Sequence, residues 1–263
     1  MNRQTVLITG ASAGIGLELA RLFAADGCDL ALVARRLDRL DELAEELRSK
    51  HSVRVDTIAS DLTLAEAPQR LFDEVAQRGL TIDVVVNNAG FGLRGKVAEI
   101  DLQRQLDMVR LNALSVLHLT RLFLPGMIER RSGGILNVAS TAAFQPGPNM
   151  AVYFATKAFV LSLTDALVEE LRGTGVSVTC LAPGPTVTEF AKAAEMEDAR
   201  LFNMGAMSAV AVARAGYRGF RRGKALVVPG LGNKLLAVGT RFMPRWLVRK
   251  IAGGLSKSPG SEK

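Results

Sequence analysis

Seven short apolar runs, separated by segments with helical periodicity, constrain the fold of this chain more than any other feature. Buried strands that alternate with helices form parallel sheets, because each crossover needs a helix and both sheet faces are then covered. We therefore expect an α/β fold with seven parallel strands in a doubly wound sheet and helices on both faces. The seven runs are VLITG, LALVA, VRVDTIAS, IDVVVNN, GILNVAS, SVTCLAPG and ALVVPG.

The length and composition fit one large α/β unit. The chain has 263 residues, of which 48% are hydrophobic, and this is enough for a well-buried core. It contains no low-complexity segment, internal repeat or Gly/Ser linker that would mark a second domain. We expect residues 1–263 to form a single domain.

A glycine-rich turn follows the first apolar run. TVLITG at residues 5–10 is followed by ASAGIG and by the helical pattern LELARLFAADG, which indicates a strand, a tight turn and a helix. Gly10, Gly14 and Gly16 have GxxxGxG spacing, and glycines in such a turn let the backbone approach a pyrophosphate at the helix N-terminus. The spacing differs from the GxGxxG dinucleotide fingerprint, so the turn alone fits a structural loop equally well.

Tyr153 and Lys157 lie four residues apart in the predicted helix MAVYFATKAFVLSLTDALVEELR, so both side chains project from one face about one turn apart. A phenol, with a pKa of about 10, is a poor base near neutral pH. A neighbouring ammonium favours the phenolate, which predicts a lowered pKa for Tyr153 and makes it a candidate general acid/base. Ser140 lies thirteen residues before it.

Further motifs accompany these residues. Thr9 precedes the glycines, NNAG at 87–90 follows the run IDVVV, and Asn112 lies in a long predicted helix. From residue 5 to about 190 the chain resembles the short-chain dehydrogenase/reductase family, which implies a Rossmann-type dinucleotide-binding catalytic domain. In that family an Asn, a Ser, a Tyr and a Lys form a catalytic tetrad. None of the four departs here, and the matching residues are Asn112, Ser140, Tyr153 and Lys157.

The resemblance and the chemistry of these side chains predict a role for each member of the tetrad. Ser140 is expected to donate a hydrogen bond to the substrate carbonyl oxygen, where charge develops as hydride arrives, while Tyr153 supplies the proton. Lys157 is expected to lower the pKa of Tyr153 and, by resemblance, to contact the nicotinamide ribose. Asn112 is expected by resemblance to hold a water molecule that links Lys157 to solvent. In the alternative, Asn112 is a solvent-facing polar residue.

Two arginines after the second apolar run bear on the choice of cofactor. NAD-selective sites place an acidic side chain about twenty residues beyond the glycine turn, whereas an Arg there accommodates the 2′-phosphate of NADP. In the sequence LALVARRLDRL, Arg35 and Arg36 occupy these positions and no carboxylate does. We expect NADP (NADPH) rather than NAD, with both guanidiniums pairing with the phosphate. In the alternative, one Arg points to solvent or pairs with Asp38 or Asp41.

The resemblance also places other residues around the dinucleotide. Ser12 is expected near the adenosine phosphate, Asp61 near adenine, and the PGxxxT stretch beneath the nicotinamide. Pro185 is an additional proline in that stretch, which stiffens the turn and removes one backbone donor. The expected cofactor-binding residues are Gly10, Ser12, Gly14, Ile15, Gly16, Arg35, Arg36, Asp61, Leu62, Asn88, Ala89, Gly90, Tyr153, Lys157, Pro183, Gly184, Thr186 and Thr188.

The sequence specifies the substrate less closely. The side chains expected to flank the carbonyl are mainly apolar, which fits an apolar ketone, an aldehyde or a 3-oxoacyl chain, and fits ordinary core or lid packing equally well. Residues 190–209 lie where the family inserts a mobile substrate lid, and their methionines suit an adaptable surface. The expected flanking residues are Phe91, Leu93, Ala142, Phe144, Met150 and Phe190.

Positive charge is concentrated towards the C-terminus. From Ala199 to Ser261 there are twelve Arg or Lys residues and no Asp or Glu, and the formal net charge of +7 comes entirely from this part. The basic C-terminal extension, residues 231–263, places cations at helical spacing beside apolar side chains, although Pro244 would interrupt a helix. The cations are Lys234, Arg241, Arg245 and Arg249, and the apolar residues are Leu235, Val238, Phe242 and Trp246.

Three explanations for the basic extension remain open in the sequence. A basic amphipathic segment with Trp and Phe can rest on anionic lipid. The same charge can steer an acidic or carrier-bound substrate such as an acyl thioester. Alternatively, the extension closes a subunit interface. Nucleic-acid binding is not expected, because no reading helix or aromatic RNA-binding motif accompanies the charge.

The cysteines, the histidines and the first residues of the chain do not indicate a metal-binding, disulfide-bonded or secreted protein. Cys28 and Cys180 are expected to be small buried side chains, and His51 and His118 stand near no carboxylate or thiol motif, so no metal site is predicted. We expect no signal peptide before the first strand and no membrane span, since charges interrupt the apolar stretches. The expected location is the cytoplasm, with peripheral membrane contact as an alternative.

Together these patterns predict an NADP-dependent oxidoreductase that reduces a ketone, aldehyde or 3-oxoacyl carbonyl to an alcohol, or catalyses the reverse, with Tyr153 as general acid/base. The resemblance implies a homodimer or homotetramer. A non-catalytic NADP-binding regulatory or scaffold protein is the alternative. The complete tetrad argues against it, because a non-enzyme has no physical need for all four side chains together.

Overall fold

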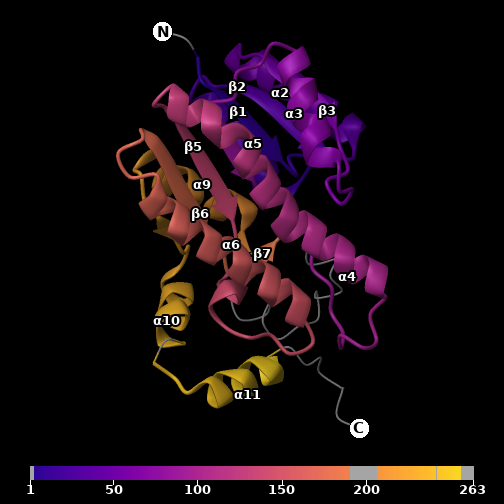
Figure 1. The fold of residues 1–263 in the computed structure, drawn as a ribbon, viewed down its shortest axis with the longest axis vertical. Helices are drawn as coiled ribbons and strands as arrows, with labels where there is room; N and C mark the ends of the chain where they lie inside the picture. Colours follow the sequence, from indigo (N-terminus) through magenta and orange to yellow (C-terminus); the bar gives the residue numbers. More distant parts are fainter. Residues whose placement is uncertain (1–2, 190–205, 241, 256–263) are drawn as a thin grey trace.

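The seven expected strands form one parallel sheet. In the computed structural model, which describes residues 3–189, 206–240 and 242–255, the strand order is β3-β2-β1-β4-β5-β6-β9 and every pairing is parallel (Figure 1). This is the order of a Rossmann-type doubly wound sheet, so the expected fold class is confirmed. The strands are β1 (Thr5–Thr9), β2 (Asp29–Ala34), β3 (Val55–Ala59), β4 (Val84–Asn87), β5 (Gly133–Val138), β6 (Val176–Leu181) and β9 (Leu226–Val227).

Helices cover both faces of the sheet because side chains alternate along each strand. Val6 and Ile8 of β1 enter one core cluster, whereas Leu7 between them enters the other. The first cluster lies beneath α1 (Gly14–Ala25), α2 (Leu37–His51) and α9 (Ala209–Arg221), and the second beneath α3 (Ala67–Gln77), α5 (Ser115–Glu129) and α6 (Ala151–Glu170).

Shorter elements surround the carboxyl ends of the strands. α4 (Leu102–Val109) continues into α5 through a π-helical turn, η1 (Arg110–Leu114), and a 3₁₀ turn, η2 (Thr141–Phe144), follows β5. β7 (Thr186–Val187) pairs with β8 (Met207–Ser208) in a second sheet that the apolar runs did not indicate. After β9, which is shorter than the run ALVVPG, come α10 (Leu231–Gly239) and α11 (Arg245–Leu255).

Within the part of the chain that the structure describes, two helical segments are long and apolar enough to cross a membrane by length and composition, namely residues 102–129 and Ala151–Glu170. The expectation that charge rules out such segments was therefore too strict. Both segments supply side chains to the second core cluster, including Leu119, Phe123 and Leu167, as the core helices of a sheet do. The two cysteines are free and buried, as expected.

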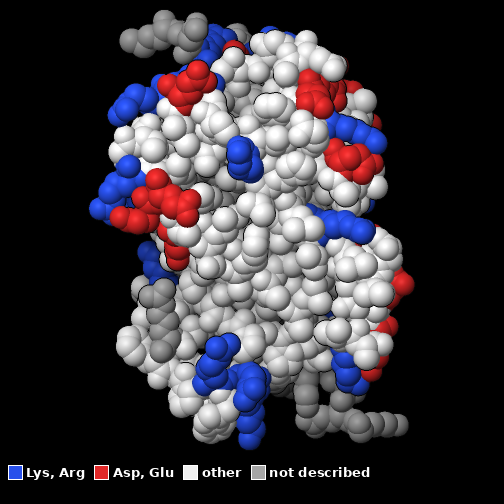
Figure 2. Space-filling view, viewed as in Figure 1, with Lys and Arg blue, Asp and Glu red and all other residues white. Residues whose placement is uncertain are grey.

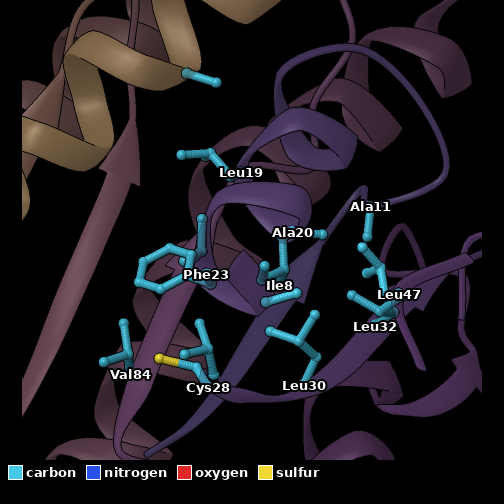
Figure 3. Packing of buried hydrophobic residues seen from close by; sticks show 14 of the residues in the cluster. Ile8, Ala11, Leu19, Ala20, Phe23, Cys28, Leu30, Leu32, Leu47 and Val84 are labelled. Carbon is cyan, nitrogen blue, oxygen red and sulfur yellow. The ribbon is translucent and has the colours of Figure 1, made fainter. Parts of the chain in front are cut away.

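Phe23 on α1 is fully buried and belongs to the first core cluster (Figure 3). Its ring packs edge-on against Tyr217 and Phe220 of α9, with ring centroids 5.0 and 6.1 Å apart. It therefore joins α1, which follows the glycine turn, to the helix beside the last strand. Edge-to-face aromatic contacts add to the stabilisation from burial alone.

Replacing Phe23 with Ala is expected to lower the free energy of unfolding by about 3–5 kcal/mol, because the cavity left between α1 and α9 cannot fully collapse. Urea denaturation followed by circular dichroism measures this change. Leu102→Ala is the matched control, since Leu102 is 67% exposed and its loss leaves no cavity. Equal effects of the two substitutions would contradict the packing of Phe23 in the core.

Candidate active site

A cavity of about 370 Å³ opens at the carboxyl ends of the parallel strands. Its walls come from the loops after β1, β2, β4, β5 and β6, together with α6 and α10. The carboxyl edge of a doubly wound sheet is where such folds bind ligands, because the connections diverge there. The residues that line the cavity include Gly10, Gly14, Arg35, Asn88, Gly90, Ser140, Tyr153, Lys157, Gly184, Glu189, Asn233 and Leu236.

The glycine turn leaves room for a group to approach the backbone. Gly10 and Gly14 adopt positive φ angles of 66° and 58°, which other residues rarely adopt. A Cβ at Gly16 would collide with the carbonyl oxygen of Gly10. No side chain caps the N-terminus of α1, where Ala13 is the N-cap. Its backbone N–H groups and the helix dipole therefore favour an anion.

Thr9 and Asn88 fasten this turn to the loop after β4. The Thr9 hydroxyl accepts hydrogen bonds from the backbone N–H groups of Asn88 and Ala89, both at 3.0 Å. The Asn88 side-chain amide donates to the carbonyl oxygens of Thr9 at 2.8 Å and Gly10 at 3.2 Å. These bonds hold two loops from neighbouring strands in one fixed arrangement at the cavity.

Ser140 is positioned where β5 ends. Its Oγ accepts a hydrogen bond from the N–H of Ala142 at 3.1 Å and so caps η2. The same hydroxyl donates to the carbonyl oxygen of Pro183, 3.3 Å away in the loop after β6. Ser140 therefore lies between two strand ends, at the wall of the cavity.

Tyr153 and Lys157 lie one turn apart in the first half of α6, and both line the cavity. Their exposed fractions are only 8% and 5%. The Lys157 Nζ lies 5.9 Å from the centroid of the Tyr153 ring and donates a hydrogen bond to the carbonyl oxygen of Val138 at 2.9 Å. The one-turn spacing therefore brings an amine and a phenol into the same pocket, as the sequence predicts.

Burial controls the protonation of both groups. It raises the pKa of the Tyr153 phenol to about 12, and a hydrogen bond with Ser140 acts in the opposite direction. Burial also lowers the pKa of the Lys157 ammonium to about 8. The lowering of the Tyr153 pKa expected from Lys157 is therefore wrong for this structure, because desolvation is the main cause of the shift, Ser140 is the group that lowers the pKa, and the Lys157 hydrogen bond goes to Val138.

Asn112 lies on the π-helical turn η1 and is almost fully buried, so the solvent-facing alternative is excluded. Its amide donates to the carbonyl oxygen of Phe91 at 2.8 Å and accepts from the N–H of Phe91 at 3.1 Å. An added Cβ at Gly90 would lie 3.0 Å from the Asn112 oxygen and 3.5 Å from the Lys157 Nζ. Gly90 therefore separates Asn112 from Lys157. π-helical turns often occur at functional sites.

Arg36 pairs with Glu189, which is neither of the two carboxylates, Asp38 and Asp41, suggested as partners by the sequence. Its guanidinium donates to Glu189 Oε2 at 2.8 Å and to Ser12 Oγ at 3.4 Å. The second Glu189 oxygen lies 3.7 Å from Arg39 Nη1. Two guanidiniums thus flank one carboxylate in the cavity wall, and Arg36 also contacts the Ser12 hydroxyl, while Arg35 lines the cavity itself.

Thirteen of the eighteen expected cofactor residues line the cavity. Arg36 lies beside it through its contact with Glu189, Ser12 contacts Arg36, and Gly16 lies beneath the turn. Asp61 accepts hydrogen bonds from the N–H and hydroxyl of Thr63, and the neighbouring residue Leu62 is buried. The five that are not in the cavity lining are Ser12, Gly16, Arg36, Asp61 and Leu62.

The expected substrate residues are divided by the structure. Three line the cavity and two pack behind it, while Phe190 lies outside the described residues. The ring of Phe154, also in the lining, contacts Tyr153 edge-on with centroids 6.1 Å apart. The expected residues that line the cavity are Phe91, Ala142 and Met150, and those that pack behind it are Leu93 and Phe144. The lining also includes residues that were not expected from the sequence, among them Arg94, Gln145, Phe154, Glu189, Asn233 and Leu236.

The free energy of unfolding of the wild type is expected to rise with pH above pH 8, and Lys157→Met is expected to remove this rise. Between pH 8 and 10.5 the unfolded chain keeps the Lys157 proton, whereas the folded protein has released it, so unfolding binds a proton and stability rises with pH. The slope from this group is at most about 1.4 kcal/mol per pH unit. Urea unfolding at pH 7, 8 and 9 compares the variant with Lys50→Met, a control at an exposed amine. Parallel pH profiles for all three proteins would contradict the prediction.

Known proteins resemble both the sequence and the structure. The sulfoacetaldehyde reductase 2 of Chromohalobacter salexigens is 42% identical over 187 residues, covering 70% of this chain and 73% of that protein. The very-long-chain 3-oxoacyl-CoA reductase of Mus musculus is 32% identical over 260 residues, covering 96% and 79% of the two chains. A short-chain dehydrogenase from Sphingobium yanoikuyae, solved in complex with NADPH, is 33% identical with a TM-score of 0.82, covering 91% and 93%.

The family assignment follows from the domain match and these relatives. The sequence pattern of the short chain dehydrogenases matches residues 4–199, which include the glycine turn and all four expected catalytic residues. The relatives and solved neighbours support an oxidoreductase that acts on CH–OH or C=O groups. This chain therefore belongs to the short-chain dehydrogenase/reductase family.

Proposed function

We propose that this protein is an NADPH-dependent carbonyl reductase in which Tyr153 donates the proton and Ser140 binds the carbonyl oxygen. The observation that carries the proposal is the arrangement of Ser140, Tyr153 and Lys157 around one cavity that also contains the glycine turn. A serine hydroxyl, a buried phenol and a buried amine meet there at the carboxyl edge of the sheet. This set of groups suits polarisation and protonation of a carbonyl.

The residues present fit a dinucleotide. The positive φ angles of Gly10 and Gly14, and the uncapped N-terminus of α1, leave space and N–H donors for a pyrophosphate. Arg35 and Arg36 lie at the end of β2 and would meet a 2′-phosphate there. When bound, NADPH would supply the hydride. NADP is proposed over NAD because Arg35 and Arg36 occupy the positions after β2 where an NAD-selective site has a carboxylate. Glu189, which reaches this place from elsewhere in the chain, is paired with Arg36 and Arg39.

The protonation states of this structure suit reduction. With a pKa raised to about 12, the Tyr153 phenol keeps its proton at neutral pH and can give it to the oxygen of a carbonyl as that oxygen gains negative charge. With a pKa lowered to about 8, the Lys157 amine is still mainly protonated at pH 7. Its positive charge would stabilise the phenolate that remains after transfer. Asn112, held by Phe91, would keep the Lys157 pocket in shape.

The side chains near Tyr153 favour an apolar carbonyl substrate. Phe91, Met150, Phe154 and Leu236 line the same cavity, while Arg94 adds a cation to its wall. An apolar body with an anionic end, such as a 3-oxoacyl thioester of coenzyme A with its phosphates, combines both features. A smaller aldehyde with an anionic end, the kind of substrate named for the sulfoacetaldehyde reductase relative, would use Arg94 and leave the apolar wall less filled.

The function is tested by following NADPH oxidation with a panel of aldehydes, ketones, diketones, sulfoacetaldehyde and 3-oxoacyl thioesters of increasing chain length. Turnover of at least one class is expected, with efficiency rising along the 3-oxoacyl series. Tight NADPH binding without turnover of any compound would favour a regulatory or scaffold role. The dependence on chain length separates the apolar substrate from the small aldehyde.

Tyr153→Phe is expected to reduce kcat by about 10²–10⁴-fold and to leave the Kd for NADPH nearly unchanged, because only the proton donor is lost. Stopped-flow reduction and fluorescence titration of NADPH measure the two quantities. Phe154→Leu is a neighbouring control on the same helix, which changes an aromatic contact and keeps the phenol. A variant at Tyr153 that retains turnover would disprove general acid catalysis by this residue.

Arg36→Ala is expected to weaken NADPH binding by about 10–100-fold, the loss typical of a hydrogen bond to a charged group, with little change for NADH. Glu189→Gln is expected to strengthen NADPH binding by up to about fivefold, since the exposed ion pair that a phosphate must displace is weak. Fluorescence titrations of the wild type and the two variants with both dinucleotides give the dissociation constants to be compared. Equal weakening of NADPH and NADH by Arg36→Ala would mean that Arg36 does not recognise the 2′-phosphate.

A further inference from the structure

The last two helices have outer faces that no described part of the protein covers. α10 and α11 follow the final strand and lie outside the sheet and its helical layers, at one end of the molecule (Figure 1). The sequence pattern placed the cations of this region on one helical face. The structure instead ends α10 at Gly239 and begins α11 at Arg245, just after Pro244, so two helices carry them, and Arg241 lies outside the described residues.

α10 has an inner face and an apolar outer face. Asn233 and Leu236 line the active-site cavity and Ala237 is buried. Leu231, Leu235 and Val238 recur at i, i+4 and i+7, and all three are exposed, with Leu235 67% accessible. Lys234 lies on the same outer face.

α11 repeats this arrangement. Val248 and Ala252, one turn apart, are buried against the protein. Trp246 and Lys250 are also one turn apart and point away from it, with Trp246 61% exposed. Arg245 and Arg249 are exposed beside them. Phe242, between the two helices, is 83% exposed.

We call these outer faces the C-terminal helical surface. Its apolar residues are Leu231, Leu235, Val238, Phe242 and Trp246, and its cations are Lys234, Arg245, Arg249 and Lys250. The sequence has no Asp or Glu between Ala199 and Ser261 that could neutralise them. Figure 2 shows Lys and Arg side chains at the end where Figure 1 places α11, while the acidic side chains on this view lie higher or along one edge.

We propose that the C-terminal helical surface docks on an anionic lipid bilayer. Large apolar side chains that are mostly exposed indicate a binding surface. Helices that combine Trp, Phe and Leu with Lys and Arg bind in the plane of an anionic membrane interface, because the apolar groups enter it and the cations meet lipid phosphates. An anionic bilayer therefore accommodates both the apolar side chains and the cations of the C-terminal helical surface.

A second copy of the chain fits the same surface less well. In a two-fold contact the same patch meets itself, so Lys234, Arg249 and Lys250 would approach identical cations. The absence of acidic residues from the patch leaves no carboxylate to compensate for that repulsion. An anionic bilayer supplies the missing negative charge.

Docking would also place the active site beside the membrane. α10 contributes Leu235 to the outer surface and Leu236 to the cavity wall, so one helix separates the two. An apolar carbonyl dissolved in the bilayer would then lie next to the cavity. This consequence rests on the proposed reductase function, whereas the docking itself does not.

The docking is tested by flotation of the full chain with vesicles of phosphatidylcholine alone or with 30% phosphatidylglycerol. Binding is expected only to the anionic vesicles and is expected to fall sharply in 0.5 M NaCl. Arg249→Ser combined with Lys250→Ser should weaken binding roughly 30-fold, because each cation near the surface contributes about fivefold. Lys50→Ser combined with Arg172→Ser is the matched control, since it removes the same charge from exposed positions elsewhere.

Leu235→Ser combined with Trp246→Ser tests the apolar half of the surface, and circular dichroism checks that each variant is folded. This pair should also lose vesicle binding while its size on gel filtration stays that of the wild type. The proposal is overturned if the wild type ignores anionic vesicles, binds neutral vesicles equally well, or binds as strongly after loss of Arg249 and Lys250 as the control does. A change in oligomer size without vesicle binding would identify a second copy as the partner and would also overturn it.

Discussion

Burial of an amine and a phenol one helical turn apart is the constraint on which the active site depends. Placing Tyr153 and Lys157 in the first turns of α6 removes both from water, so each resists its charged form, and the phenol remains a proton donor at neutral pH. Such burial is tolerated because the Lys157 amine donates to the carbonyl oxygen of Val138, where β5 ends. The strand that carries Ser140 therefore also stabilises the lysine.

Local patterns were sufficient for the sheet, the glycine turn and the pairing of Tyr153 with Lys157, whereas the family resemblance supplied the tetrad as a set. Apolar runs of strand length and a helix-period spacing depend only on neighbouring residues, so β1, α1 and the pair on α6 follow from the sequence. The pKa of Tyr153 could not be predicted in the same way, because it depends on how completely other elements exclude water. The sequence shows that Lys157 is near, but it does not show that burial of the phenol dominates the Tyr153 pKa.

Contacts between distant segments account for what sequence reasoning missed. Asn233 and Leu236 reach the cavity because α10 follows the last strand and passes the loop after β6, where a Cβ on Gly184 would collide with Asn233. No periodicity joins residues fifty positions apart. The partner of Arg36 was missed for the same reason, since Glu189 comes from 153 residues further along the chain. The sequence predicted an interruption of the helical pattern at Pro244, and α11 begins just after it. The sequence did not predict that the inner face of α10 would line the active-site cavity.

The pairing of Arg36 with Glu189 would keep the proposed phosphate site ordered before a phosphate arrives. Guanidiniums gathered for a phosphate repel one another, and a carboxylate between Arg36 and Arg39 relieves this repulsion. Because the three side chains are about half exposed, water screens the pair and its net contribution is at most about 1 kcal/mol. A phosphate carries more charge and more acceptor oxygens than a carboxylate, so it can displace Glu189 at little cost. The weakness of this ion pair therefore makes it compatible with the proposed binding of NADPH.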